Sequence, residues 1–134
     1  MKKLVLISHG NFCVELKKSA EMIMGPQDNI YAIPLLPEDG PESYLKKFQD
    51  VVKELDDYVV FADLMGGTPA NTVAKEIMKG KDIELYAGAN LPMVIEFVNS
   101  NMINQPSNYV DVARSGILKV NDVISLDDDD EDDE

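Results

Sequence analysis

Four short apolar segments alternate with longer segments of helical periodicity, and this alternation is the feature that most limits how the chain can fold. The apolar segments are residues 4–7, 30–35, 58–62 and 83–87. Each is too short for a buried helix and ends in a polar turn, so we predict four β-strands. Strands that alternate with helices indicate an α/β protein with a doubly wound, mostly parallel sheet, because parallel strands need a crossover connection.

Helix signals fill the segments between and after these strands. We expect helices over residues 11–24, 41–55, 68–79 and 107–115, and one that begins after Asn90. Thr68, Asn90 and Ser107 are the predicted N-caps, since their side chains can accept hydrogen bonds from the first free amides. A fifth strand is expected at residues 116–124, which gives the strand order 2-1-3-4-5.

The only histidine, His9, lies at the carboxyl end of the first predicted strand. Ligands bind at the carboxyl edge of an open parallel sheet, because the loops that lead into the helices face a crevice there. His9 is therefore a candidate catalytic residue. A single histidine at this place can equally be a turn residue that is bonded to the backbone.

A second informative loop follows the third strand and contains Asp63, Gly66, Gly67 and Thr68. In the order 2-1-3-4-5 the first and third strands are neighbours, so Asp63 would face His9. A carboxylate beside an imidazole accepts the Nδ1 hydrogen and leaves Nε2 free as a nucleophile or base. The glycine pair at a helix start can direct backbone N–H groups at a phosphoryl group. Taken singly, the aspartate and the glycine pair are also ordinary turn residues.

The sequence lacks the residues that other kinds of active or binding site need. One histidine and one cysteine are too few for a typical His/Cys metal site, and no glycine-rich nucleotide-binding motif is present. Cys13 is expected in the core, and methionines such as Met65 are expected to be packing residues. The net charge is −13 with no basic cluster, which argues against nucleic acid as a partner.

Residues 1–126 fit a single domain. The eight acidic residues 127–134 are expected to form a disordered tail, because adjacent like charges repel one another and bury no apolar surface. No apolar segment approaches the roughly 20 residues of a membrane span, and nothing at the start resembles a signal peptide. We therefore expect a cytoplasmic protein.

The loop motifs together resemble one known family, the IIA component of the mannose-type sugar phosphotransferase system of bacteria. The resemblance covers residues 1–124. It rests on Ser8-His9-Gly10 after the first strand, on the segment from Asp63 to Asn71, and on the segment from Gly88 to Met93.

This resemblance implies a phosphocarrier. In the family, the histidine after the first strand accepts a phosphoryl group on Nε2 from the phosphocarrier protein HPr and donates it to a IIB component; by position it is His9. The resemblance gives Asp63 the hydrogen bond to this histidine, and gives Gly66, Gly67 and Thr68 the binding of the phosphoryl group. It implies neither a cofactor nor a metal.

The resemblance also implies a homodimer, in which the last strand is exchanged and adds antiparallel to the neighbouring sheet. Residues 116–124 match that strand. Because residues 127–134 stand where some members continue into a fused IIB domain, we expect the IIB partner to be a separate polypeptide. The membrane components IIC and IID would then be indirect partners.

Two alternatives stay open at the level of the sequence. The phosphocarrier subunit of dihydroxyacetone kinase also uses a histidine after its first strand, although it lacks the loop found here at residues 63–69. A flavodoxin-like module that binds a phosphorylated ligand without chemistry is the second alternative.

Overall fold

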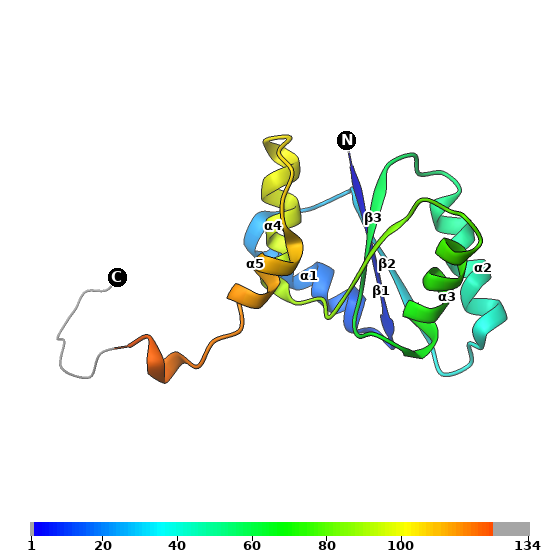
Figure 1. Cartoon of the computed structure of the whole chain (residues 1–134), viewed down its shortest axis with the longest axis horizontal. Coiled ribbons are helices and arrows are strands. Elements are labelled where there is room, and N and C mark those ends of the chain that lie inside the picture. The colour runs from blue at the N-terminus through cyan, green and yellow to red at the C-terminus, as the bar shows by residue number, and fades with distance from the viewer. Residues whose placement is uncertain (1, 125–134) are drawn as a thin grey trace.

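The computed structural model describes residues 2–124, so the predicted acidic tail at residues 127–134 lies outside the described residues. The secondary structure elements alternate as the sequence predicts (Figure 1). In chain order they are β1 (Lys3–His9), α1 (Phe12–Met24), β2 (Ile30–Leu35), α2 (Pro41–Val52), β3 (Tyr58–Ala62), α3 (Gly67–Met78), β4 (Glu84–Ala87), α4 (Leu91–Met102), α5 (Tyr109–Ser115) and the short 3-10 helix η1 (Val120–Asp122).

The four strands form one parallel sheet in the order β2-β1-β3-β4. This confirms the predicted α/β class and the order of the first four strands. The two central strands, β1 and β3, pair from Lys3 opposite Tyr58 to Ile7 opposite Ala62. Their carboxyl ends are therefore adjacent. Pro34 lies in the edge strand β2, where a missing backbone N–H costs least.

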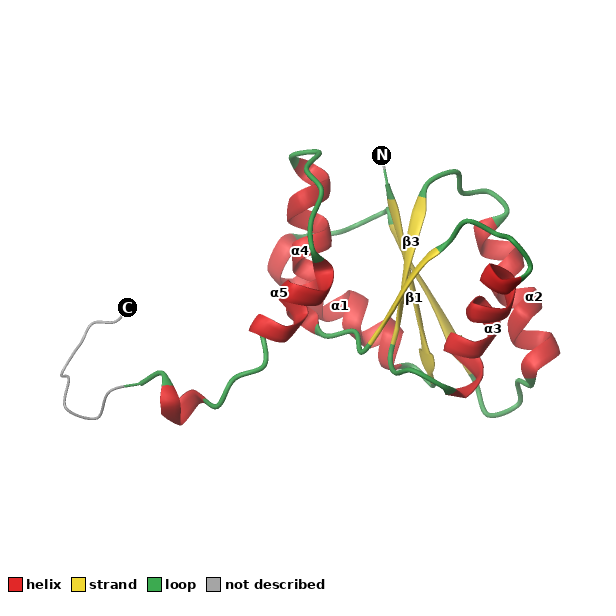
Figure 2. Ribbon diagram, viewed as in Figure 1, coloured by secondary structure: helices red, strands yellow, loops and turns green. Residues whose placement is uncertain are grey.

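Helices cover both faces of the sheet (Figure 2): α1, α4 and α5 lie on one face, and α2 and α3 on the other. The strand β1 contributes to both cores because successive side chains point to opposite faces. Leu4 and Leu6 pack toward α1 and α4, whereas Val5 and Ile7 pack toward α2 and α3. All four are 1% exposed or less. Each such side chain contributes about 2 kcal/mol to the free energy of folding.

Two of the three predicted N-caps are wrong, by one or two residues. The helix α3 begins at Gly67 with Gly66 as its N-cap, so Thr68 lies inside the first turn rather than at the cap. The helix α5 is capped by Asn108, whose Oδ1 accepts the Asp111 N–H at 3.1 Å, and not by Ser107. The predicted cap at Asn90 is confirmed, since its Oδ1 accepts the Met93 N–H at 3.1 Å.

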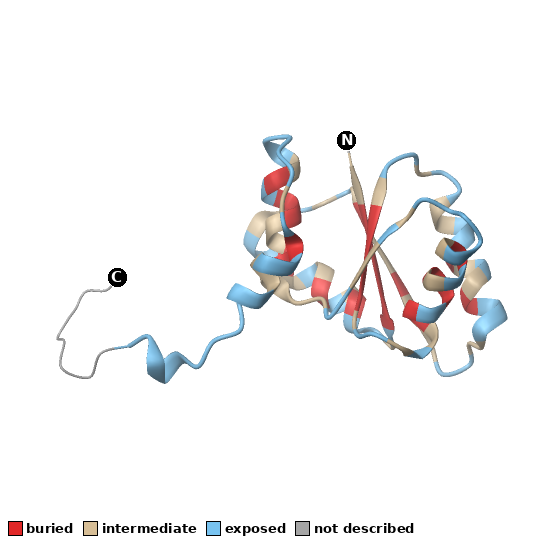
Figure 3. Cartoon of the chain, in the orientation of Figure 1, coloured by how far each residue is buried: buried red, intermediate tan, exposed pale blue. Residues whose placement is uncertain are grey.

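No fifth strand is present among the described residues of the single chain, so the predicted strand at residues 116–124 and its exchange in a dimer stay predictions. Residues 116–124 are exposed, and they contain η1 instead of an extended segment. A strand needs a neighbouring strand for its backbone hydrogen bonds. Beyond α5 the chain leaves the body of the protein without reaching the sheet (Figure 3). None of the helices within residues 2–124 has the length and apolar character that crossing a membrane requires.

Candidate functional site

The side chains of His9 and Asp63 meet at the carboxyl ends of β1 and β3. Their Nδ1 and Oδ2 atoms are 2.8 Å apart. An ionised carboxylate can only accept a hydrogen bond, so the Nδ1 atom carries the hydrogen and the Nε2 atom keeps its lone pair. The imidazole is 47% exposed, whereas the Asp63 side chain is only 12% exposed. The arrangement presents an oriented nucleophile to the solvent.

Asp63 accepts three hydrogen bonds. Its Oδ2 receives both the His9 backbone N–H, at 2.9 Å, and the His9 ring, while its Oδ1 receives the Leu64 N–H at 2.9 Å. Burial alone would raise the pKa of this carboxyl group. The hydrogen bonds from His9 and Leu64 outweigh that effect and lower the pKa below its usual value. The Asp63 side chain is therefore a fixed negative charge against the imidazole.

The glycine pair of the second loop lies directly against the imidazole. Gly66 and Gly67 have φ angles of +82° and +77°, which residues with a side chain rarely adopt. A Cβ atom on Gly67 would lie 2.7 Å from His9 Cε1 and 2.9 Å from His9 Nε2. The position therefore requires glycine for two reasons, and the Nε2 side of the ring faces the start of α3.

The first amides of α3 donate no hydrogen bond to a capping side chain, because the N-cap is Gly66. The helix α4, which begins at the same edge of the sheet, differs because the Asn90 side chain accepts the Met93 N–H. The helix α2 also has a glycine N-cap, Gly40, and its first amides have no side-chain cap. Free amides at a helix start, together with the helix dipole, favour a bound anion. Thr68 is partly buried in this same first turn.

The loop that follows β4, at residues 88–90, is held beside the site by a backbone hydrogen bond. The Ala89 N–H donates to Ala62 O at 3.0 Å, which holds this loop beside the end of β3. The Asn90 side chain caps α4 and also donates from Nδ2 to Ala113 O at 2.8 Å. Asn90 is therefore a structural residue of α4 and α5.

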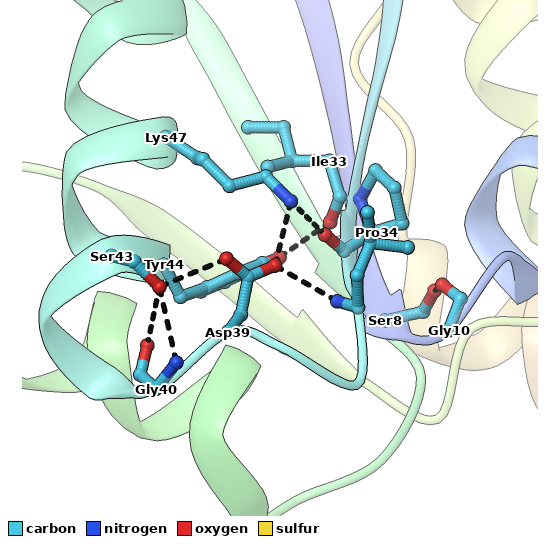
Figure 4. Close-up of polar contacts among 10 residues, drawn as sticks. Ser8, Gly10, Ile33, Pro34, Asp39, Gly40, Ser43, Tyr44 and Lys47 are labelled. Atoms are coloured by element: carbon cyan, nitrogen blue, oxygen red, sulfur yellow. Dashed lines mark hydrogen bonds and ion pairs between the residues drawn. The ribbon is translucent and has the colours of Figure 1, made fainter.

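A polar network fixes the loop between β2 and α2, which lies beside the His9 turn (Figure 4). Asp39 accepts hydrogen bonds from the Leu36 N–H, from Ser43 Oγ and from Lys47 Nζ, at 2.8–2.9 Å. Lys47 Nζ also donates to Pro34 O at 2.6 Å. The hydrogen bond from Lys47 is the main reason why the pKa of Asp39 falls to about 2. The sequence alone did not reveal this network.

Two apolar residues next to Asp63 are unexpectedly exposed. Leu64 is 49% and Met65 is 88% exposed, which contradicts the expected packing role of Met65. On the α1 side of the site, Phe12 is 48% exposed. Cys13, by contrast, is buried as expected. Within residues 2–124, no three His, Cys, Asp or Glu side chains are grouped so that they could hold a metal ion.

Comparison with known proteins points to one family. The sequence profile described as "PTS system fructose IIA component" (EIIA-man) matches residues 3–113. The chain is 29% identical over 102 residues to the PTS system fructose-specific EIIA component of Bacillus subtilis (strain 168), a match that covers 74% of this chain and 70% of that protein. It is 30% identical over 96 residues to the PTS system mannose-specific EIIAB component of Escherichia coli (strain K12), covering 69% of this chain and 30% of that protein.

The fold leads to the same group of proteins. A solved structure described as the mannose/sorbose specific IIA subunit of the phosphotransferase system from Enterococcus faecalis superposes with a TM-score of 0.80. Its sequence is 30% identical, and the match covers 96% of this chain and 98% of that one. The residues that match the family profile include the loops of His9 and Asp63.

Proposed function

The chain belongs to the EIIA-man family of IIA components of the phosphotransferase system, and from this premise we propose that His9 accepts a phosphoryl group from HPr and donates it to a separate IIB component. Membership of the family implies a phosphocarrier role in sugar uptake. The observation that carries the finer proposal is the 2.8 Å contact between His9 Nδ1 and Asp63 Oδ2, which leaves the lone pair of Nε2 free as the nucleophile on a side chain that is 47% exposed.

The proposed reaction forms one bond and breaks another in line. The lone pair of His9 Nε2 attacks the phosphorus atom of the donor phosphohistidine, and the donor ring leaves with the electrons of its P–N bond. Positive charge then develops on the His9 ring, which keeps its hydrogen on Nδ1. The carboxylate of Asp63 stabilises this charge through the hydrogen bond that already exists in the free protein.

The start of α3 is the proposed binding site for the phosphoryl oxygens. Gly66, Gly67 and Thr68 supply backbone N–H groups there, and the absence of a Cβ atom on Gly67 lets this backbone approach Nε2. The transferred group carries negative charge on its oxygen atoms, which the helix dipole and the free amides stabilise. The relay requires neither a metal ion nor a bound cofactor, and it would run in the cytoplasm.

The test is the intact mass of the protein after incubation with phosphoenolpyruvate, enzyme I and HPr. We expect a single phosphate on the wild type, lost on acidification because phosphohistidine is labile to acid. The His9→Ala variant should gain none, and omission of HPr should prevent the reaction. The proposal is wrong if the wild type stays unmodified while the donor proteins phosphorylate a control IIA component.

Residues 116–124 have a proposed role in a homodimer. Several of their apolar side chains are exposed, among them Ile117 at 76% and Val123 at 65%. Among residues 2–124 the edge strand β4 pairs only with β3, which leaves one side of its backbone without a strand partner there. A second copy that lays its own residues 116–124 along β4 would cover both features.

Light scattering coupled to size-exclusion chromatography tests this dimer. The expected mass in solution is about twice the 14.9 kDa of one chain. Deletion of residues 117–134 should give a monomer, because it removes the exchanged segment. A wild type that stays monomeric at micromolar to millimolar concentrations would refute the dimer but not the phosphocarrier role.

A further inference from the structure

Ser8 precedes His9 and, unlike it, has no exposed surface. Its hydroxyl group makes two hydrogen bonds across the turn that carries His9. The Oγ atom accepts the Cys13 N–H at 2.8 Å and donates to Gly10 O at 3.0 Å. One buried side chain therefore joins the end of β1 to the start of α1.

The bond to Cys13 replaces a conventional helix cap. The N-cap residue of α1 is Asn11, which makes no side-chain capping bond. The Cys13 N–H is one of the first amides of the helix, which have no acceptor within the helix itself. Because Ser8 lies in β1, its bond ties the start of α1 to the strand residue that directly precedes His9.

The bond to Gly10 fixes the residue that follows His9. The Gly10 N–H donates to Leu35 O at 2.7 Å, so with Ser8 bonded to its carbonyl oxygen both polar backbone groups of Gly10 are held. Figure 4 shows Ser8 and Gly10 together beside the loop that follows β2. The backbone N–H of His9 itself donates to Asp63 Oδ2. The backbone of His9 is thus restrained at three points.

We infer that the Ser8 hydroxyl is a positioning group for phosphoryl transfer, which keeps the His9 turn in the geometry where Nδ1 meets Asp63 and Nε2 faces Gly67. This inference rests on the proposed phosphocarrier role of His9. Without the hydroxyl, the buried Cys13 N–H loses its acceptor, and the partly buried Gly10 carbonyl loses a donor. The Cys13 N–H can regain an acceptor only if the turn moves, and such a movement displaces the imidazole from Asp63.

The test compares Ser8→Ala and Ser8→Thr with a matched control, Ser100→Ala. Ser100 is also buried, at 5% exposure, and its Oγ donates to Phe97 O in α4. The rate of phosphorylation is measured over a range of HPr concentrations. Because ångström-scale misplacement of a nucleophile slows a reaction strongly, we expect Ser8→Ala to lower kcat about 10- to 100-fold with little change in the KM for HPr. Ser8→Thr, which keeps the hydroxyl, should recover most of the loss.

Nitrogen NMR of the His9 ring supplies a readout that a purely structural role would not move. The wild type is expected to carry its neutral-state hydrogen on Nδ1, whereas Ser8→Ala should show a mixture of both tautomers. Ser100→Ala should match the wild type in both measurements. If Ser8→Ala does not fold, Ser8→Cys is judged by the same two readouts, because a thiol of similar size is a poor hydrogen-bonding group.

Three results would overturn the inference. They are an unchanged rate and an unchanged tautomer in Ser8→Ala, equal losses in Ser8→Ala and Ser100→Ala, or a Ser8→Thr variant as slow as Ser8→Ala. A wild type that takes no phosphate from HPr refutes the proposed function instead. In that case the tautomer comparison still decides whether Ser8 positions the ring.

Discussion

Replacing Gly67 with alanine is expected to slow phosphoryl transfer to His9 severely. The new Cβ atom would lie 2.7 Å from His9 Cε1 and 2.9 Å from Nε2, distances that two uncharged groups in contact do not reach. Either the imidazole leaves Asp63 or the first turn of α3 moves away from the ring. Both movements break the alignment of the nucleophile with its binding site, so we expect a loss of about 100-fold or more, measured as phosphate uptake against time by intact mass.

Gly80→Ala is the matched control for this prediction. Gly80 also has a positive φ angle, +104°, and a Cβ atom there would meet no other atom within 4 Å. It follows Lys79, the C-cap of α3, at the end of the helix opposite the imidazole. Both variants force a side chain to a positive φ angle, which costs about 1–3 kcal/mol of folding free energy. Urea unfolding should therefore show destabilisation in both, whereas the rate of Gly80→Ala should stay within about twofold of the wild type. Equal rates for the two variants would mean that backbone strain, and not contact with His9, explains the effect.

The strands could be predicted because their signals are local. Residues 30–35 and 58–62 are short apolar segments bounded by turns, and they match β2 and β3 in full. The meeting of His9 and Asp63 also followed from the sequence, since the predicted strand order makes β1 and β3 neighbours. This second prediction used a general property of parallel sheets, namely that the carboxyl ends of neighbouring strands lie at the same edge.

The misplaced helix starts have tertiary causes. Ser107 has a suitable side chain for a cap, but its hydroxyl donates to Glu96 on α4, and Asn108 takes the cap instead. Thr68 and Pro69 have the composition of a cap and first turn, yet α3 starts one residue earlier because Gly66 and Gly67 adopt positive φ angles against His9. Local sequence preference carries no information about either contact.

The supporting groups of the site were not predictable for the same reason. Ser8 directly follows the predicted strand at residues 4–7, where a serine is an ordinary turn residue. Its two hydrogen bonds across the His9 turn therefore become visible only in the folded chain. No sequence motif around Asp39 indicates a partner for its carboxylate, but the fold brings Lys47 and Ser43 to it. At residues 116–124 the local preference is present but the tertiary partner is not. Their β-branched side chains favour a strand, but within the described chain no strand lies alongside them.

Replacing Asp63 with asparagine is expected to preserve the fold and to slow phosphoryl transfer by about 100-fold or more. The two carboxylate oxygens of Asp63 accept three N–H donors, two from His9 and one from Leu64. An asparagine has one oxygen and one NH₂ group, so in either orientation its NH₂ group faces an N–H donor. If it faces His9, the Nδ1 hydrogen moves to Nε2 and blocks the nucleophile; if it faces Leu64, the ring keeps its tautomer but loses the negative charge that stabilises the imidazolium.

Asp57→Asn is the matched control, because it removes one negative charge at the opposite end of the same strand β3, away from the imidazole. The rate of phosphate uptake from HPr should fall in Asp63→Asn and stay within about twofold of the wild type in Asp57→Asn, since an exposed charge far from the reacting atoms is screened. Nitrogen NMR of His9 then separates the two orientations of the asparagine, because only the first changes the tautomer. A wild-type rate in Asp63→Asn would show that His9 reacts without a fixed charge on its Nδ1 side, and the stabilising role proposed for Asp63 would have to be abandoned.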